Sequence, residues 1–172
     1  NMQVSRQLGP ESKKIALPEL EERLEQVIRV KGEAGLNDLR NKASAIAETK
    51  AAYELAETAG NTNLQAVSLV LEANNFQILT DIFGPVPFNE AVVPGITKPV
   101  HDTEEVVYDG ILAMLNEAET LFASGTGEFT STADFIYQGD VAKWRKFGAS
   151  LKLKALKKIT KKRNVTAEVT AL

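Results

Sequence analysis

The chain has 172 residues, of which 44% are hydrophobic and 25% are charged, and its net charge is −3. These values are typical of one globular domain with a sizeable core, and we expect residues 1–172 to form a single helical domain. Because the chain has no cysteine, disulfides, thiolate metal sites and cysteine nucleophiles are excluded. No stretch reaches the roughly 18 consecutive apolar residues that a membrane span needs, and residues 1–14 lack the apolar centre of a signal peptide.

The first two predicted helices lie before residue 60. Residues 1–17 show no sustained period, whereas apolar residues after Pro18 recur at helical spacing as far as Gly32 or Gly35. A second helix is predicted from about residue 37 to Ala59, with small apolar side chains on its packing face. Gly60 follows as the residue that ends it.

The next helix is predicted to be capped by Thr62, which stands three residues before Gln65 as in a capping box. Gly84-Pro85 ends this helix, since proline lacks an amide proton and disfavours helix before it. Further prolines at 87, 94 and 99 predict an irregular loop over residues 84–101. A loop of this length inside a compact domain is either packed down or functional.

Two more helices follow. Asp102 is the predicted cap of a helix that ends in residues 124–127, with Glu105 as its box partner. Residues 129–137 are predicted to run extended, and Asp140 then caps the last helix. In that helix an apolar stripe is predicted, which Leu153 does not join: Trp144, Phe147, Leu151, Leu156 and Ile159.

Five helices and no convincing sheet predict an all-α fold of stacked antiparallel helical hairpins, a tetratricopeptide-like superhelix. No clean sequence repeat supports this prediction, and the Trp/Leu/Gly/Tyr signature of tetratricopeptide units is absent. The prediction therefore depends on the number of helices and the short turns between them.

No catalytic constellation is visible in the sequence. His101 is the single histidine, and it has no metal ligands at suitable spacing, so we interpret it as a surface histidine. Asp81, Glu90, Asp102 and Asp109 could include a glycosidase-type carboxylate pair, but caps and solvated helix faces explain them better. The sequence predicts no enzyme, no cofactor and no metal site.

Ten basic residues and no acidic ones lie between residues 141 and 167. One interpretation is a solvated helix face that meets acidic surface of the same protein. The other is a patch for nucleic acid or anionic lipid. Because few aromatic residues interleave the lysines and the whole chain is acidic, we expect no nucleic-acid partner.

The aromatic residues allow two interpretations. Trp144, the only tryptophan, can stack on a sugar or a base, but its helical spacing with Phe147 and Leu151 favours a place in the core. The same two interpretations, a ligand contact or a place in the core, apply to Tyr108 and Tyr137. Gly148 inside a helix costs about 1 kcal/mol relative to alanine, which indicates a close backbone contact or a bend.

Three stretches, residues 76–91, 102–118 and 134–154, carry a resemblance. Their sequences are FQILTDIFGPVPFNEA, DTEEVVYDGILAMLNEA and DFIYQGDVAKWRKFGASLKLK. They resemble the segments ILTDLFGDVPYSEA, DTQEEIYDGILAELDEA and ADLIYGGDVAKWKKFANSLKLR of the SusD/RagB-like proteins, in the same order and at family spacing. The resemblance covers about residues 60–160, and the first 60 residues match only in being helical.

The resemblance implies a non-catalytic glycan- or nutrient-binding protein of the bacterial cell surface, whose partner is a SusC-type TonB-dependent outer-membrane transporter. It also implies attachment to the outer membrane through an N-terminal lipid anchor that this chain does not contain. Family members are roughly three times as long, so we expect the chain to be the N-terminal or a trimmed part of a longer protein.

The chain departs from the family pattern at two places, since Pro85 replaces a common acidic residue and Gly148-Ala149-Ser150 replaces Ala-Asn-Ser. The family's aromatic sugar platforms match no motif here, so the ligand-binding residues stay unknown. The alternative is a helical-repeat scaffold for protein–protein interaction without sugar binding.

Overall fold

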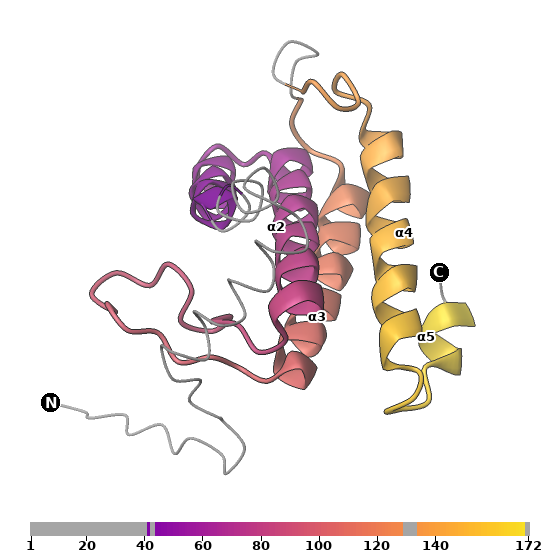
Figure 1. Cartoon of the computed structure of the whole chain (residues 1–172). Coiled ribbons are helices and arrows are strands. Elements are labelled where there is room, and N and C mark those ends of the chain that lie inside the picture. The colour runs from indigo at the N-terminus through magenta and orange to yellow at the C-terminus, as the bar shows by residue number, and fades with distance from the viewer. Residues whose placement is uncertain (1–40, 42–43, 129–133, 171–172) are drawn as a thin grey trace, which may run out of the picture.

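The structure is a computed structural model that describes residues 41, 44–128 and 134–170. Within them the chain is helical (Figure 1): a helix over residues 44–58, α2 (Thr62–Phe83), α3 (Glu104–Ser124), α4 (Val141–Ile159) and the short α5 (Thr166–Thr170). The described residues contain no strand, only an isolated bridge between Val86 and Asp102. The all-α prediction is confirmed. The helix predicted after Pro18 lies outside the described residues.

The three long helices lie side by side, and α3 contacts both α2 and α4. In Figure 1 the chain runs down α2, back up α3 and down α4, so consecutive helices are antiparallel. The helix over residues 44–58 lies beside α2 and is seen nearly end-on. The described part of the chain is thus a stack of helices, as the helix count predicted.

Helix α2 is the central element. Fourteen of its 22 residues are buried, so it is covered on most of its sides and not on one stripe. The buried set includes polar side chains, among them Glu72, Asn75 and Gln77. Helices α3 and α4 follow the amphipathic pattern more closely, since their buried residues return at helical spacing.

Two helix starts differ from the prediction by one residue. Helix α2 is capped by Asn61, whose Oδ1 accepts from the Leu64 amide at 2.9 Å, and not by Thr62. Helix α3 is capped by Thr103 and not by Asp102, because the Asp102 carboxylate accepts hydrogen bonds from the preceding loop instead. Both errors have the same cause, since neighbouring polar residues compete for the cap and tertiary contacts decide between them.

Three other predicted helix ends, all within the described residues, are confirmed. Gly84 and Gly125 follow α2 and α3 with positive φ angles of 75° and 59°, a conformation that favours glycine. Asp140 caps α4, and its Oδ1 accepts from the Lys143 amide at 3.1 Å. In each case the local sequence alone determines where the helix ends.

The extended segment predicted over residues 129–137 is wrong for its described part. Residues 134–139 form a tight turn in which the Gln138 amide donates to the Asp134 carbonyl oxygen at 3.0 Å. The Asp134 side chain stabilises this turn by accepting several of its amides, as described below. Residues 129–133 lie outside the described residues.

The apolar stripe predicted for α4 packs into the core. Trp144 is only 2% exposed and Leu156 is fully buried, whereas Leu153 is 48% exposed on the opposite face. Gly148 is buried against α2, and a Cβ built there would lie 3.2 Å from Cγ2 of Val70. This glycine therefore marks the close helix contact that the sequence indicated.

Gly110 on α3 faces the ring of Phe88, which also packs edge-on against Phe76 at 4.7 Å between centroids. A Cβ at position 110 would fall inside the van der Waals envelope of that ring. We expect Gly110→Ala to lower the free energy of unfolding by about 1–3 kcal/mol through overpacking, which outweighs the roughly 1 kcal/mol gain in helix propensity.

Urea unfolding followed by circular dichroism measures the Gly110→Ala effect. Phe88→Ala in the same background removes the clashing ring, so the double variant is expected to lose less stability than the two single changes added together. Strict additivity would contradict this explanation.

Burial of Glu72 on α2 gives a second prediction. The residue is 4% exposed, and its Oε1 lies 3.9 Å from Nζ of Lys50. Burial raises the pKa of this carboxyl, and the Lys50 charge only partly opposes the rise. The native state therefore holds this proton more tightly than the unfolded state, and stability falls as pH rises through the two pKa values.

We expect Glu72→Gln to remove this decrease of stability with rising pH. The difference in unfolding free energy between wild type and variant, measured by urea titration from pH 4 to 8, should shift in favour of the variant as pH rises. A difference that shifts toward the wild type would show that the Lys50 pair outweighs burial.

Candidate functional site

The loop over residues 84–101 is held at its base by two of the acids noted in the sequence. Asp102 Oδ2 accepts from the amides of Phe88 at 3.0 Å and Asn89 at 2.8 Å, and its Oδ1 accepts from Nδ2 of Asn89 at 2.8 Å. Glu90 Oε2 accepts from the Val100 amide at 2.8 Å. These carboxylates bind the backbone of their own loop and are engaged in structure.

His101 lies half-buried beside Asp102 at the end of this loop. Burial lowers the pKa of its imidazole, and the Asp102 charge acts in the opposite direction, so the ring is neutral at pH 7. Among the described residues no group of three His, Cys, Asp or Glu side chains could hold a metal ion. The structure thus brings no metal-ligand set to His101 in the described part of the chain.

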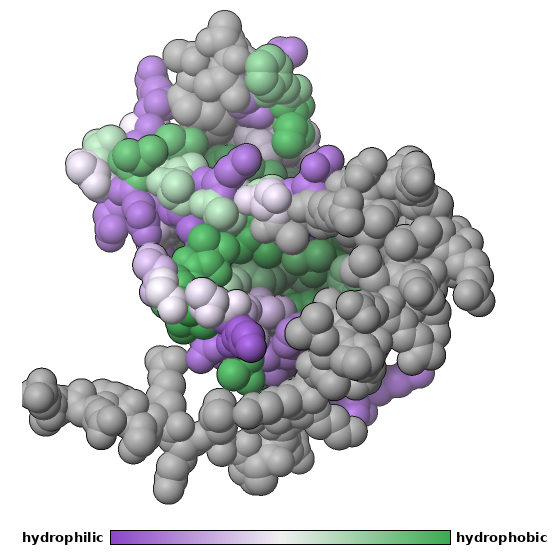
Figure 2. Space-filling model, turned by 60° about the vertical axis from the view of Figure 1, so that its left-hand side comes forward, coloured by the Kyte–Doolittle hydropathy of each residue, from purple (hydrophilic) through white to green (hydrophobic). Residues whose placement is uncertain are grey.

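The loop also exposes apolar side chains. Val92, Val93 and Ile96 near its tip are exposed, and Val92 has a φ of 58°, which is rare for a β-branched residue. On the face shown in Figure 2, apolar side chains drawn in green lie near the centre, with hydrophilic side chains in purple to their left, above and below. Lys50 Nζ donates to the Ala91 carbonyl oxygen at 2.9 Å and connects the loop to the helix over residues 44–58.

The other two acids line a cavity of about 450 Å³ where the end of α2 and the start of α3 meet the end of α4. Asp81 Oδ1 accepts from the Tyr108 hydroxyl at 2.5 Å and pairs with Nζ of Lys158 at 2.9 Å, and Lys154 lies 3.7 Å from its Oδ2. Burial opposes ionisation, but the hydrogen bonds from Tyr108 and Lys158 outweigh it and lower the pKa of the Asp81 carboxyl. The carboxylate is ionised and fully engaged.

Asp109 in the same cavity accepts from Nη1 of Arg163 at 2.8 Å. A glycosidase-type pair needs one carboxyl that keeps its proton near neutral pH. Here Asp81 has a lowered pKa and Asp109 faces a guanidinium, so this pair of acids is arranged for ion pairing and not for proton transfer.

The basic run over residues 141–167 finds much of its counter-charge within the protein. Five of its ten basic residues pair with acids of the described chain: Lys143, Arg145, Lys154, Lys158 and Arg163. Arg145 Nε donates to both carboxylate oxygens of Glu119, at 2.9 and 3.1 Å. These contacts support the first interpretation of the basic run, a helix face that meets acidic surface of the same protein.

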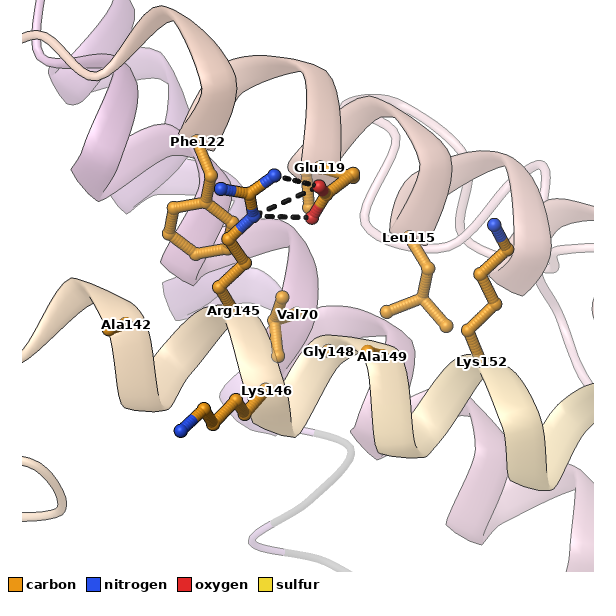
Figure 3. A pocket seen from close by; sticks show the side chains of 11 residues that line it. Val70, Leu115, Glu119, Phe122, Ala142, Arg145, Lys146, Gly148, Ala149 and Lys152 are labelled. Atoms are coloured by element: carbon orange, nitrogen blue, oxygen red, sulfur yellow. Dashed lines mark hydrogen bonds and ion pairs between the residues drawn. The ribbon is translucent and has the colours of Figure 1, made fainter. Parts of the chain in front are cut away.

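A groove of about 360 Å³ lies where α3 and α4 meet over α2. Figure 3 shows Val70, Leu115 and Phe122 at its apolar base, with the Arg145–Glu119 ion pair beside Phe122. The groove has an apolar base and charged edges, a combination that can hold a ligand through apolar contacts and hydrogen bonds.

The residue that the sequence interpretation missed is Asp134, which is 6% exposed. Its Oδ1 accepts from the amides of Ile136 and Tyr137 at 2.9 and 3.0 Å, and its Oδ2 from the Gly139 amide at 2.9 Å and from Nε1 of Trp144 at 2.7 Å. Burial opposes ionisation, but the hydrogen bonds from Trp144 and the three amides outweigh it and lower the pKa of this carboxyl.

Two predicted aromatic residues belong to the same arrangement. Trp144 lies in the core, as its spacing indicated, and Tyr137 packs edge-on against it at 5.0 Å between centroids. Tyr108 is buried and bound to Asp81. In contrast Phe135, in the turn that Asp134 holds, is 91% exposed.

A SusD-like family profile, described as "Starch-binding associating with outer membrane", matches residues 23–172. The chain belongs to the SusD-like family. The match extends the resemblance seen over residues 60–160 toward the N-terminus. No curated protein matches the chain.

Solved structures agree with the SusD-like assignment. A SusD homologue from Bacteroides fragilis is 31% identical with a TM-score of 0.57, over 70% of this chain and 24% of the other. A homologue from Bacteroides uniformis is 24% identical with a TM-score of 0.60, over 70% and 25%. A chitin-binding homologue from Flavobacterium johnsoniae is 26% identical with a TM-score of 0.54, over 64% and 24%.

This SusD-like chain spans about a quarter of the length of these homologues. None of the described helices has the length and apolar character needed to cross a membrane. The described helices thus match one helical part of these larger structures.

Proposed function

We propose that this chain is the helical part of a non-catalytic, cell-surface glycan- or nutrient-binding protein that works with a SusC-type TonB-dependent transporter. The observation that carries the proposal is the family match over residues 23–172, whose description names starch binding and the outer membrane. One solved homologue is described as chitin-binding, which gives a second glycan besides starch as a candidate ligand.

The geometry of the described residues supports binding over bond making. The four acids that a glycosidase would use hold a loop or pair with basic side chains. The grooves are lined by apolar and charged side chains that can contact a ligand.

The proposal includes the place of the chain in a longer protein. Since the SusD homologues are about four times as long as the part matched, we propose that this helical domain belongs to a longer SusD-like polypeptide. That polypeptide would be attached to the outer membrane by a lipid on an N-terminal cysteine upstream of residue 1, on the surface- or periplasm-facing side.

Affinity electrophoresis of the full-length protein in gels that contain starch or chitin, together with a glycan array, tests the binding. We expect retarded migration in at least one glycan and co-purification of a barrel transporter from outer-membrane extracts. Co-purification without retention by any glycan would favour the alternative, a helical-repeat scaffold for protein–protein interaction.

A further inference from the structure

The aromatic side chains of the described residues are buried or half-buried with one exception. Phe135 is 91% exposed, and Ile136 beside it is 59% exposed. Exposing a phenylalanine leaves its apolar surface in water, which burial would otherwise remove at a gain of about 1.5–3 kcal/mol. Because the other aromatic rings of the described residues are buried or half-buried, the exposure of Phe135 needs an explanation.

The turn that presents Phe135 is held by a set of hydrogen bonds. The Asp134 carboxylate accepts from three amides of the turn and from the Trp144 indole, so the backbone on both sides of Phe135 is held to the core. Gln138 adopts a φ of 58° and Gly139 a φ of 82°, a left-handed pair that the carboxylate stabilises. A ring on such a support loses little conformational freedom when a ligand stacks on it.

Hydrogen-bonding groups lie in the same turn. The side-chain amide of the exposed Gln138 offers both a donor and an acceptor. The Asp140 carboxylate follows, half-buried, with Nζ of Lys143 at 3.2 Å from its Oδ2. An apolar ring beside groups of both hydrogen-bonding types matches the two sides of a sugar, an apolar C–H face and a rim of hydroxyls.

We propose that the turn over residues 134–139 is a carbohydrate contact, in which Phe135 stacks on the apolar face of a pyranose ring and Gln138 hydrogen-bonds its hydroxyls. The proposal rests on the glycan-binding function proposed above and assigns that function a residue. Two exposed side chains are far smaller than the roughly 800 Å² per partner of a stable protein interface, whereas one ring suffices for one sugar.

Two substitutions at position 135 separate stacking from simple apolar contact. Phe135→Tyr keeps the aromatic face, and Phe135→Leu keeps apolar area without it. In the full-length protein, we expect the tyrosine variant to bind starch or chitin oligosaccharides within about twofold of wild type and the leucine variant about five- to tenfold more weakly. Leu55→Ala, which removes apolar area at a 71% exposed site on the helix over residues 44–58, is the matched control and should bind normally.

Thermal unfolding of each variant accompanies the binding titrations. Because the ring is exposed in this chain, the melting temperatures should stay within about 2 °C of wild type. A larger fall for Phe135→Leu would show that another part of the longer polypeptide covers the ring, and would contradict the sugar contact. If wild type binds a glycan and Phe135→Leu binds it equally well, the stacking contact is wrong and the proposed function stands. If wild type is retained by no starch, chitin or arrayed glycan, the proposed function fails and this inference with it.

Discussion

Replacing Trp144 with alanine is expected to lower the free energy of unfolding by about 3–5 kcal/mol, the range for removing a large buried aromatic side chain. The indole is 2% exposed, packs edge-on against Tyr137 and Phe147, and donates its Nε1–H to Asp134. The substitution leaves a cavity and removes one of the two hydrogen bonds that Oδ2 of Asp134 accepts, so that only the bond from the Gly139 amide remains. Urea unfolding monitored by far-ultraviolet circular dichroism measures the loss.

Leu153→Ala is the matched control on the same helix, because Leu153 is 48% exposed on the opposite face. Leu153→Ala should lower the free energy of unfolding by no more than about 0.5 kcal/mol. Equal losses for the two variants would mean that α4 does not dock through its Trp144 face.

Asp134→Ala, which removes the buried carboxylate, is expected to lower the free energy of unfolding by about 3 kcal/mol. Hydrogen bonds to a charged group contribute about 1.5–3 kcal/mol net, and a buried donor left without a partner costs a further 1–3 kcal/mol. In Asp134→Ala the buried Trp144 indole N–H loses its acceptor, while water can reach part of the turn. Asp109→Ala, which removes a carboxylate whose side chain is 53% exposed, should cost less than about 1 kcal/mol.

The Asp134 contribution should also depend on pH in a defined direction. Because the folded-state pKa of this carboxyl is lowered, the difference between wild type and Asp134→Ala is fully present above the unfolded pKa of about 3.9. It disappears as pH falls through the lower folded pKa. Urea titrations between pH 2.5 and 7 measure this difference, and a gap that widens on acidification would contradict the assignment.

Much of the fold follows from local sequence. Gly84, Gly125 and Asp140 are recognisable as helix ends because the left-handed backbone and the side-chain cap are decided by one or two neighbouring residues. The stripe of α4 is also visible, because a helix with a single buried face has a clear period. What these elements share is that distant residues do not compete for the same groups.

The errors occur where distant groups do compete. Asp102 has the right spacing for a cap, but the amides of Phe88 and Asn89 take its carboxylate. The buried polar side chains of α2 could not be predicted either, because helices on several sides cover them. A single sequence does not show which neighbours a polar residue will meet.

The acids of the candidate site can be identified one by one in the sequence, but their roles depend on the fold. Asp81 and Lys158 lie far apart in the chain and meet only when α4 packs beside α2. Asp134 carries no sequence signal of its importance, since its carboxylate acts through backbone amides and the indole of Trp144. The exposure of Phe135 likewise becomes notable only once the other aromatic side chains of the described residues are seen to be buried or half-buried.

The closed base of the loop over residues 84–101 has a consequence for how such chains diversify. The Asp102 amide donates to the Val86 carbonyl oxygen at 2.9 Å, so the two ends of the loop are fastened to each other before α3 begins. Segments inserted between Ala91 and Pro99 would enlarge the loop at a small entropic cost while α2 and α3 keep their register. Relatives could therefore acquire new recognition surfaces at this point by lengthening, without any change in the helices that support them.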